Sequence, residues 1–442
     1  MTERKIFGTD GVRDVANSGL MTPEAALSLG RAYVKATGSR RIVVGRDTRL
    51  SGQMLEGALV SGMSSEGAEV YLAGIIPTPG VSYSVQALGA DGGAVISASH
   101  NPAEYNGIKF LGSDGCKLSD TDELAVEAML YEPANSSPDI GAVHDMPVLV
   151  REYALHIAGM LSPDAVISGI AFDCAAGAAS ETVPILCGET LFSGMNSHII
   201  CSGYDGRNIN KDCGVMHMDN ITGYVTTHAL ALGFAFDGDA DRVLISDKYG
   251  RVIDGDIILW VLGRWQKAVS GNDKVVATVM SNMALEKHLS DEGIRTIRCP
   301  VGDRYVLESM RKSGAGLGGE QSGHIIAFPF TGTGDGLCTA VLFLNALKYL
   351  KEDPSELVDK FGRYPQRLTS IKLNSPREEL DMTAVNRIVS LYTWQVAGGR
   401  IYVRKSGTEP LLRILVEGPE STAVAGVSEE LTSRLKVFLG EC

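Results

Sequence analysis

The sequence predicts an α/β protein in which a strand–helix rhythm recurs three times and is followed by a smaller α+β domain. The 442 residues, 44% of them hydrophobic, are enough for several cores, and a chain of this length is expected to form about three or four domains. Short apolar runs alternate with helical patterns as far as about residue 365, where longer strands take over. The expected domains are residues 1–150, 151–250, 251–365 and 366–442.

In the first domain, strands and helices alternate in the order typical of a mainly parallel sheet covered by helices. Thr22 followed by Pro23 predicts the start of a helix, whose apolar face consists of Ala25, Leu29, Ala32, Tyr33 and Ala36. Residues 41–45 and 70–72 predict buried strands, with a helix from Ser51 between them. Residues 77–80 predict a turn before a third helix, and residues 131–150 lose the pattern, which predicts a linker.

The rhythm restarts at residues 169–173 and continues to two apolar strands, 234–236 and 243–245. A third run begins near Asp254, with a helix whose apolar positions are Ile257, Val261 and Trp265 and with strands at 275–277 and 294–297. In the last domain we expect strands at 368–373 and 400–403. A final helix is predicted by the spacing of Val424, Val427, Leu431, Leu435 and Phe438.

Composition narrows the class of function. The formal net charge of −13 excludes a general nucleic-acid or anionic-membrane binder, so an anionic substrate must be held by a few local cations. No apolar run approaches the roughly 20 residues of a transmembrane helix, and residues 1–5 do not open a secretory signal. The eight cysteines form no metal-finger spacing and are interpreted as reduced core thiols of a cytoplasmic protein.

The first stretch with chemical potential is Ser-Ala-Ser-His-Asn-Pro at residues 97–102, between the apolar runs 94–96 and 108–110. Asn followed by Pro forces a turn, so Ser99 is expected on a tight, exposed loop where a nucleophile is useful. An ordinary polar turn is the alternative. His100 adjoins the serine, but neighbouring side chains on an extended loop point apart, so we do not expect it to be the base.

Three carboxylates, Asp237, Asp239 and Asp241, lie within five residues at the mouth of a strand. Hard oxygen ligands of this kind suit Mg²⁺. An EF-hand is excluded because Arg242 and Lys248 stand where that motif requires glycine and glutamate. A solvated acidic loop remains the alternative. Arg242 is placed to neutralise a phosphate held by the ion.

Two further stretches combine glycines with polar groups. Residues 319–324 gather donors and acceptors suited to sugar hydroxyls, and residues 404–410 combine two cations, two hydroxyls and a glycine in a plausible phosphate cradle. Simple polar turns are the alternatives. Together, a serine nucleophile, a Mg²⁺ site, a polyol site and a separate phosphate site indicate phosphoryl transfer through a phosphoserine, on a substrate that keeps one phosphate while exchanging another.

As an ordered set these motifs resemble the α-D-phosphohexomutase superfamily over essentially the whole chain. The resemblance is carried by residues 7–13, 97–102, 106–110, 237–242, 301–305, 319–324 and 404–410. Gln321 and Gly407 favour the phosphoglucosamine mutase family within it. Ala240 and residues 215–216 depart from the usual pattern, and neither departure touches an expected ligand side chain.

The resemblance implies four domains around a central cleft, three of them related mixed α/β units. It implies interconversion of glucosamine 6-phosphate and glucosamine 1-phosphate through a phosphorylated Ser99 and glucosamine 1,6-bisphosphate. One Mg²⁺ per chain is expected on Asp237, Asp239, Asp241 and a phosphoserine oxygen. The other roles are assigned to Lys109 as general acid or base, to Arg13, Arg242 and His324 around the transferring group, to Glu320 and Ser322 on the sugar, and to Arg404, Ser406, Gly407 and Thr408 on the distal phosphate.

Lys109 is chosen because an amine can exchange protons where burial or nearby charge lowers its pKa; an ion-pairing structural lysine is the alternative. The rival functions are a phosphomannomutase or phosphoglucomutase, a Mg²⁺-dependent sugar phosphatase, and a non-catalytic sugar-phosphate sensor. The expected partner is a small sugar phosphate, with no nucleic acid or membrane, and the resemblance is compatible with a homodimer.

Overall fold

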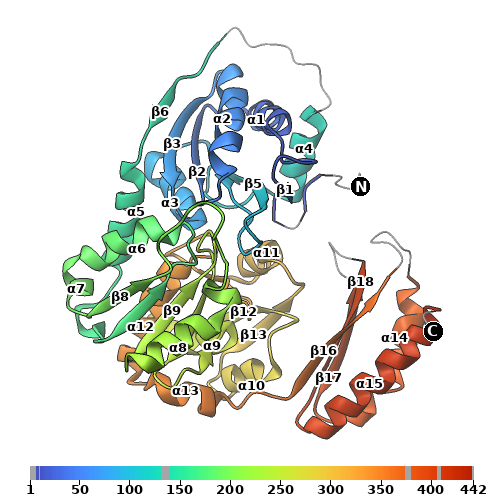
Figure 1. The fold of residues 1–442 in the computed structure, drawn as a ribbon. Helices are drawn as coiled ribbons and strands as arrows, with labels where there is room; N and C mark the ends of the chain where they lie inside the picture. Colours follow the sequence, from blue (N-terminus) through green and yellow to red (C-terminus); the bar gives the residue numbers. More distant parts are fainter. Residues whose placement is uncertain (1–5, 9, 131–138, 374–379, 406–409, 441–442) are drawn as a thin grey trace. The chain divides into compact units, whose positions relative to one another are not determined.

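The computed structural model (Figure 1) describes residues 6–8, 10–130, 139–373, 380–405 and 410–440, and the chain divides into two compact units. The larger unit comprises residues 1–280 and 292–358, and the smaller one comprises residues 281–291 and 359–442. Three sheets lie in the larger unit and one in the smaller. The predicted class, three mixed α/β sheets followed by a smaller α+β unit, is confirmed.

The first sheet has six strands in the order β1-β5-β4-β2-β3-β6. Its strands are β1 (Val12–Val15), β2 (Arg41–Arg46), β3 (Glu69–Ile75), β4 (Gly92–Ile96), β5 (Tyr105–Gly112) and β6 (Val143–Asp145). Its helices are α1 (Pro23–Thr37), α2 (Gly52–Ser65), α3 (Thr78–Leu88), α4 (Asp120–Leu130) and α5 (Val148–Gly159). β5 runs antiparallel to β1 and β4, whereas β2, β3, β4 and β6 are parallel.

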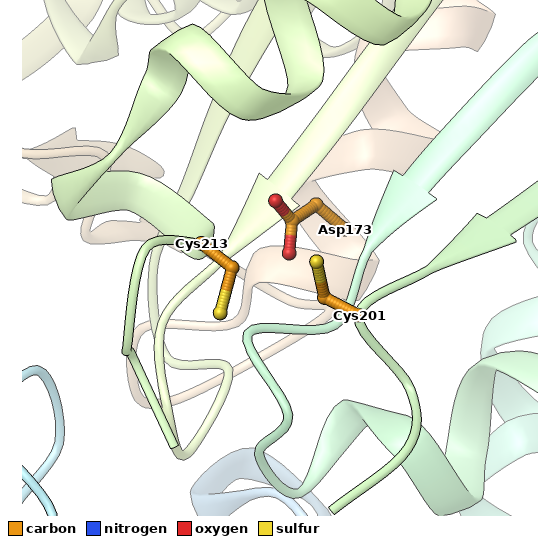
Figure 2. A group of neighbouring side chains, drawn as sticks. All are labelled: Asp173, Cys201 and Cys213. Carbon is orange, nitrogen blue, oxygen red and sulfur yellow. The ribbon is translucent and has the colours of Figure 1, made fainter. Parts of the chain in front are cut away.

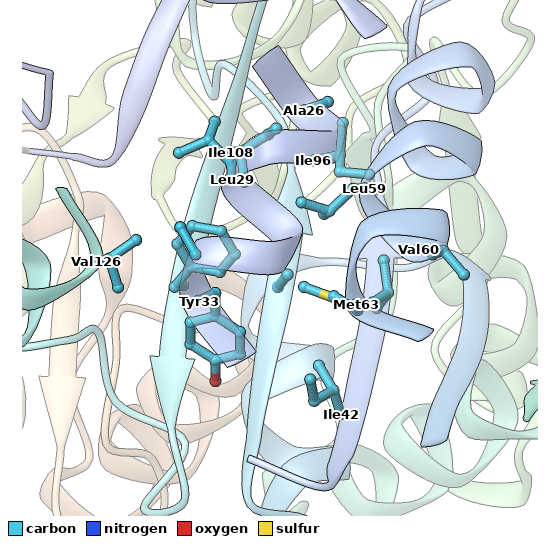
Figure 3. Close-up of a cluster of buried hydrophobic side chains, with 14 of the residues drawn as sticks. Ala26, Leu29, Tyr33, Ile42, Leu59, Val60, Met63, Ile96, Ile108 and Val126 are labelled. Atoms are coloured by element: carbon cyan, nitrogen blue, oxygen red, sulfur yellow. The ribbon is translucent and has the colours of Figure 1, made fainter. Parts of the chain in front are cut away.

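The core of this sheet forms where α1 and α2 pack against it (Figure 3). The Thr22 side chain caps α1 as predicted, accepting from the Ala25 amide at 3.3 Å. Ala26, Leu29 and Tyr33 of α1 meet Leu59 and Met63 of α2, and all five are fully or almost fully buried. The two helices approach closely because Gly30 and Gly62 lie at their crossing: a Cβ built at either one would fall 2.1–2.2 Å from a carbonyl oxygen of the other helix.

The second sheet has the order β11-β10-β9-β7-β8 and the third has the order β13-β12-β14-β15. Their strands are β7 (Ile170–Asp173), β8 (Ser197–Ile200), β9 (Leu232–Phe236), β10 (Val243–Asp247), β11 (Val252–Ile253), β12 (Lys274–Thr278), β13 (Arg295–Cys299), β14 (Leu317–Gly319) and β15 (Ile325–Ala327). The helices that alternate with these strands or follow them are α6 (Ala179–Gly188), α7 (Thr190–Ser193), α8 (Met218–Thr227), α9 (Gly255–Ser270), α11 (Asp303–Ser313) and α12 (Gly336–Leu350). β7, β8 and β9 are parallel, so their carboxyl ends share one edge.

In the smaller unit, α14 and α15 pack on an antiparallel sheet of order β16-β18-β17 and form an apolar core with it. The elements are β16 (Gln366–Lys372), β17 (Arg400–Lys405), β18 (Leu411–Glu417), α10 (Met283–Asp291), α14 (Met382–Ser390) and α15 (Ser421–Phe438), and α13 (Pro354–Phe361) leads into the unit. The sequence predicted the outer strands and α15 but not the central β18. Phe438, expected on the apolar face of α15, is 45% exposed at the end of the helix.

Two local predictions were wrong. Residues 77–80 do not form a separate turn, because α3 already begins at Thr78 and proline is compatible with the first turn of a helix. The expected linker contains β6, which pairs with β3 and completes the first sheet. The domain boundaries stay predictions, and α5 (Val148–Gly159) runs across the expected one between residues 150 and 151. In the described part of the chain, no helix combines the length and apolar character needed to cross a membrane.

The crossing of α1 and α2 generates a stability prediction. Gly62→Ala places a methyl group against the Leu27 carbonyl oxygen, and we expect a loss of about 2 kcal/mol or more in unfolding free energy because the backbones must separate. Gly57→Ala on the same helix is the matched control, since position 57 is exposed and a Cβ there meets no atom within 4 Å. That variant should gain up to about 1 kcal/mol from helix propensity. Urea denaturation followed by circular dichroism measures both, and equal effects of the two substitutions would contradict the close crossing.

Candidate active site

Four chain segments of the larger unit bring their polar side chains together. They are the serine loop (residues 97–102) after β4, Lys109 on β5, the acidic loop (residues 237–242) between β9 and β10, and the Glu320 turn (residues 320–324) between β14 and β15. The sequence predicted each segment separately. Hydrogen bonds and ion pairs now connect them.

The guanidinium group of Arg49 donates hydrogen bonds to backbone carbonyls of the serine loop. Nη2 donates to the Ser99 carbonyl at 2.9 Å and to the Asn101 carbonyl at 2.8 Å, while Nη1 donates to the Tyr105 carbonyl at 2.9 Å. The Arg49 side chain is completely buried, and its charge is balanced by Asp47 at 2.9 Å. A rigid, planar donor group therefore fixes several carbonyls of an irregular loop at once.

The same carboxylate also orients the backbone at the serine. Asp47 accepts from the Ser97 hydroxyl at 2.6 Å, and the Ser97 oxygen accepts from the Ser99 amide at 2.9 Å. From another segment, the side-chain amide of Asn210 donates to the Ser99 carbonyl at 2.9 Å. These contacts keep Ser99 in the left-handed region at φ 51°, a conformation that a non-glycine residue holds only when its surroundings enforce it.

Two predictions about this loop were wrong. Ser99 is not exposed: it is 1% accessible, because the acidic loop covers it and Asp237 Oδ2 accepts from its hydroxyl at 2.6 Å. His100 does not point away, since its Nδ1 lies 3.2 Å from Ser99 Oγ. The left-handed turn at Ser99 removes the alternation of an extended chain. Burial, aided by Arg242 and Arg13, lowers the pKa of His100 to about 3, so the ring is neutral at physiological pH.

The acidic loop concentrates negative charge away from water. Asp237, Asp239 and Asp241 are buried, and each offers one carboxylate oxygen within 4.8 Å of the others. Burial and the two neighbouring carboxylates raise the pKa of Asp237 well above its usual range. Asp239 Oδ1 and Asp241 Oδ1 have no hydrogen-bond partner among the described residues. Buried carboxylate oxygens without partners fit a hard divalent cation such as Mg²⁺.

Lys109 supplies the nearest positive charge. Its Nζ donates to Asp239 Oδ2 at 2.8 Å and lies 3.1 Å from Asp10 and 3.7 Å from Asp241. Burial alone would raise the pKa of Asp239, but the charge and hydrogen bond of Lys109, with a 2.6 Å bond from Thr78, hold that pKa below its usual range. The amine is thus placed among carboxylates from two sheets, and Asp239 is ionised.

Asp10 extends this network toward His324. Asp10 pairs with Arg13 on β1 and with Lys117, and Lys117 also pairs with Asp303 at the start of α11. His324 Nε2 lies 3.8 Å from a carboxylate oxygen of Asp303 and 3.8 Å from one of Asp241. Charges from the first and third sheets therefore meet beside the acidic loop.

The backbone ties the Glu320 turn to the acidic loop. Arg242 and His324 form an isolated antiparallel bridge, and the Val243 amide donates to the Gly323 carbonyl at 3.1 Å. The Glu320 carboxylate is partly exposed: Oε1 accepts from the Gly302 amide at 3.1 Å, and Oε2 accepts from the Ser322 hydroxyl at 3.4 Å. These two predicted sugar ligands thus face each other across one turn.

Of the predicted phosphate cradle, Arg404 lies on β17 in the smaller unit and is half-buried. Ser406, Gly407 and Thr408 lie outside the described residues. Their assignment to the distal phosphate stays a prediction.

Sequence reasoning assigned no role to five charged or polar residues of this site, namely Arg49, Thr78, Asp10, Lys117 and Asp303, although Asp10 and Asp303 lie in stretches that carry the family resemblance. One observation could have indicated Arg49: residues 47–49 follow the buried strand β2, which is parallel to β4. Because the carboxyl ends of adjacent parallel strands lie together, the segment after β2 had to meet the serine loop after β4.

Comparison with known families adds to this geometry. Models of the phosphoglucomutase/phosphomannomutase family match residues 4–136 (alpha/beta/alpha domain I), residues 254–364 (alpha/beta/alpha domain III) and residues 395–433 (C-terminal domain). The chain is 43% identical over 450 residues to the phosphoglucosamine mutase of Anoxybacillus flavithermus, covering 99% of both chains. It is also 43% identical over 428 residues to that of Moorella thermoacetica, covering 94% of this chain and 96% of the relative.

Among solved structures, a phosphoglucomutase/phosphomannomutase family protein from Burkholderia thailandensis superposes with a TM-score of 0.83. The two are 24% identical, and the match covers 98% of this chain and 97% of the other. At that identity the likeness establishes the fold.

The unpartnered carboxylate oxygens predict that Mg²⁺ stabilises the protein. At about 100 times its dissociation constant, a ligand that binds only the folded state contributes about 2.7 kcal/mol, so Mg²⁺ should raise the Tm by a few degrees. Asp241→Asn should abolish this shift, whereas Asp145→Asn, which removes an exposed carboxylate on β6, should retain it. Differential scanning calorimetry with and without Mg²⁺ makes the comparison, and an unchanged shift in Asp241→Asn would place the ion elsewhere.

Proposed function

The chain belongs to the phosphoglucosamine mutase family of phosphohexomutases, and from this premise we propose that it interconverts glucosamine 6-phosphate and glucosamine 1-phosphate through a phosphorylated Ser99. The observation that carries the proposal is the 2.6 Å contact between Ser99 Oγ and Asp237 in a fully buried cluster of three carboxylates. A phosphate on this oxygen adds negative charge to a site that already holds three buried carboxyl groups. Such a site suits phosphoryl transfer only when cations compensate that charge.

The compensating cations come from the chain and from a metal ion. Asp237, Asp239 and Asp241, with an oxygen of the phosphoserine, would hold Mg²⁺, and the unpartnered oxygens of the last two fit that role. When bound, Mg²⁺ neutralises charge on the transferring phosphoryl group. Arg242 is the last residue of the acidic loop; its positive charge faces Asp241 and Asp237, which raise its pKa against the effect of burial. Arg242 therefore stays charged beside the reacting phosphate.

The reaction requires the sugar to be held in two opposite orientations. The sugar hydroxyl takes the phosphoryl group from Ser99, giving glucosamine 1,6-bisphosphate. This intermediate turns so that its other phosphoryl group is transferred to the Ser99 oxygen, which regenerates the phosphoserine and leaves glucosamine 1-phosphate as the product. Glu320 and Ser322, joined by a hydrogen bond, are proposed to bind the hydroxyls in both orientations. Arg404, Ser406, Gly407 and Thr408 are proposed to hold whichever phosphate is not reacting.

Three further residues are assigned to the transfer. Arg13 and His324 are proposed to stabilise the phosphoryl group or the substrate, because both have buried nitrogens without hydrogen-bond partners in the described part of the chain. Lys109 is proposed as the general acid or base: its amino group lies 2.8 Å from Asp239 Oδ2 and 3.7 Å from Asp241 Oδ2, both in the loop whose Asp237 contacts Ser99. The same contacts also suit a lysine that only neutralises charge, so the two roles need an experiment.

The function is tested by ³¹P NMR on the protein with Mg²⁺, glucosamine 6-phosphate and a trace of glucosamine 1,6-bisphosphate. We expect a glucosamine 1-phosphate resonance to grow without free phosphate. Release of free phosphate instead would indicate a phosphatase. If the protein converts glucose or mannose phosphates and not glucosamine 6-phosphate, it is a phosphoglucomutase or phosphomannomutase.

Ser99→Ala should abolish this turnover while leaving the fold intact, because the hydroxyl that receives the phosphate is gone. The comparison is Ser180→Ala, which removes a buried hydroxyl from α6 that has no hydrogen-bond partner among the described residues; it should keep wild-type turnover. Circular dichroism confirms that both variants are folded. Wild-type rates in Ser99→Ala would remove the phosphoserine from the mechanism.

The variant Lys109→Arg distinguishes a lysine that acts as general acid or base from one that only neutralises charge. Arginine keeps the positive charge near Asp239 but does not exchange its proton at neutral pH, and general acid–base catalysis contributes about 10²–10⁴-fold to rate. We expect kcat to fall by at least about 10²-fold in Lys109→Arg while the Mg²⁺-induced Tm shift persists. Retention of most of the activity would show that Lys109 acts through its charge alone.

A further inference from the structure

A second group of potential metal ligands lies in the second sheet, apart from the acidic loop (Figure 2). Asp173 ends β7, Cys201 directly follows β8, and Cys213 precedes the short helix η2 (Gly214–Met216). The two sulfurs and one carboxylate oxygen lie within 4.8 Å of one another, and the thiols share a hydrogen bond. This group could not be predicted from the sequence, because its members are 28 and 12 positions apart and form no known motif.

The carboxylate is already held in place by donors from the surrounding loops. Asp173 Oδ1 accepts from the Ala175 amide at 2.9 Å, and Oδ2 accepts from the Gly214 amide at 3.0 Å and from the Asn220 side chain at 3.2 Å. The Asn220 side chain also donates to Cys201 Sγ at 3.0 Å. Hydrogen bonds to the ligand atoms themselves are the usual support of a protein metal site.

The charge of Asp173 has no cationic partner. The carboxylate is fully buried, and no lysine, arginine or histidine of the described chain forms an ion pair with it. A bound divalent cation would neutralise two of the three negative charges that the carboxylate and the two sulfurs carry after the thiols lose their protons.

We propose that Asp173, Cys201 and Cys213 form a second metal site, which takes a thiophilic divalent cation such as Zn²⁺. Two thiolates and one carboxylate supply three of the four ligands of a tetrahedral Zn²⁺, with bonds of about 2.3 Å to sulfur and about 2.0–2.2 Å to oxygen. In a tetrahedral Zn²⁺ site the ligand atoms lie roughly 3.5–4 Å apart. The three ligand atoms of this group lie within 4.8 Å of one another, so they need to approach by at most about 1 Å to bind the ion. Cys201 is partly exposed, which leaves a route for the ion and a place for a water molecule as the fourth ligand.

Binding releases the two thiol protons to solvent and forms two metal–sulfur bonds, with no change of oxidation state. The ligand chemistry distinguishes this site from the acidic loop, because sulfur ligands disfavour Mg²⁺ and three carboxylates favour it. The two sites can therefore hold different ions in the same molecule.

The ion would also reach the serine loop. Cys201 and Cys213 bracket the segment that carries Asn210, whose side chain donates to the Ser99 carbonyl at 2.9 Å and to the Asn101 carbonyl at 3.1 Å. The backbone amide of Asn210 donates to the carbonyl of Ala175 at 2.8 Å, and Ala175 is two residues from Asp173. An ion that joins both ends of this segment to β7 fixes the support of Ser99. This consequence depends on the proposed function, whereas the metal site itself does not.

The test is a titration of the reduced, metal-free protein with Cd²⁺ in excess Mg²⁺, which keeps the acidic loop occupied. We expect the ultraviolet charge-transfer band of cadmium–thiolate bonds to saturate at one Cd²⁺ per chain. Cys213→Ser and Cys201→Ser should each weaken the apparent affinity at least tenfold and reduce the band. Cys187→Ser is the matched control, since this partly exposed thiol on α6 stands outside the group, and it should leave the titration unchanged.

A second measurement uses the unaltered protein and so does not depend on the folding of a variant. Zn²⁺ should protect Cys201 from iodoacetamide, read by peptide mass spectrometry, while Cys187 is alkylated at the same rate with and without the ion. Absence of a Cd²⁺ band, a full band in Cys213→Ser, or unprotected Cys201 at saturating Zn²⁺ would each overturn the proposal. If a Cys201–Cys213 disulfide re-forms in the reduced protein before the ion is added, this would overturn the proposal as well.

Discussion

The burial of three carboxylates within five residues is the constraint on which the rest of the site depends. Removing even one carboxylate from water is costly unless a charge partner or hydrogen-bond donors compensate. Asp239 meets this condition through Lys109 and Thr78, and Asp241 lies within 3.8 Å of Lys109, Arg242 and His324. Asp239 Oδ1 and Asp241 Oδ1 nevertheless accept no hydrogen bond from the described residues, and a divalent cation bound there would complete their coordination.

This constraint also explains why the site spans several sheets. The acidic loop projects from the second sheet, Lys109 from the first, and His324 from the third. Each sheet thus supplies charges that another one needs, which couples the positions of the sheets to the electrostatics of the site. The clamp of Arg49 serves the same end, because its four carbonyl partners fix Ser99 Oγ against Asp237 before any substrate arrives.

The sequence was sufficient for features that are local along the chain. The Asp237–Asp241 spacing, the Asn–Pro turn after Ser99 and the strand–helix rhythm are visible within short windows, and their positions agree with the structure. It was insufficient where long-range packing decides. The strand before Arg49 could place its segment beside the serine loop, but it does not reveal the individual hydrogen bonds to residues 50 positions away. The contact of His100 with Ser99 arises from a left-handed φ that the covering loops impose. Domain boundaries and the roles of the phosphate cradle stay predictions.

The second sheet shows how one edge can offer two chemically different ligand sets. The parallel strands β7, β8 and β9 end side by side, and Asp173, Cys201 and Asp237 stand at or directly after their last residues. Oxygen ligands gather beyond β9, and sulfur joins a carboxylate beyond β7 and β8. Since hard and soft cations partition by ligand type rather than by affinity alone, the proposed Mg²⁺ and Zn²⁺ sites would take different ions although both lie at this edge. The segment that carries Asn210 lies between Cys201 and Cys213 and binds the Ser99 carbonyl, so an ion on the sulfur-containing set would hold in place the loop that carries the proposed nucleophile.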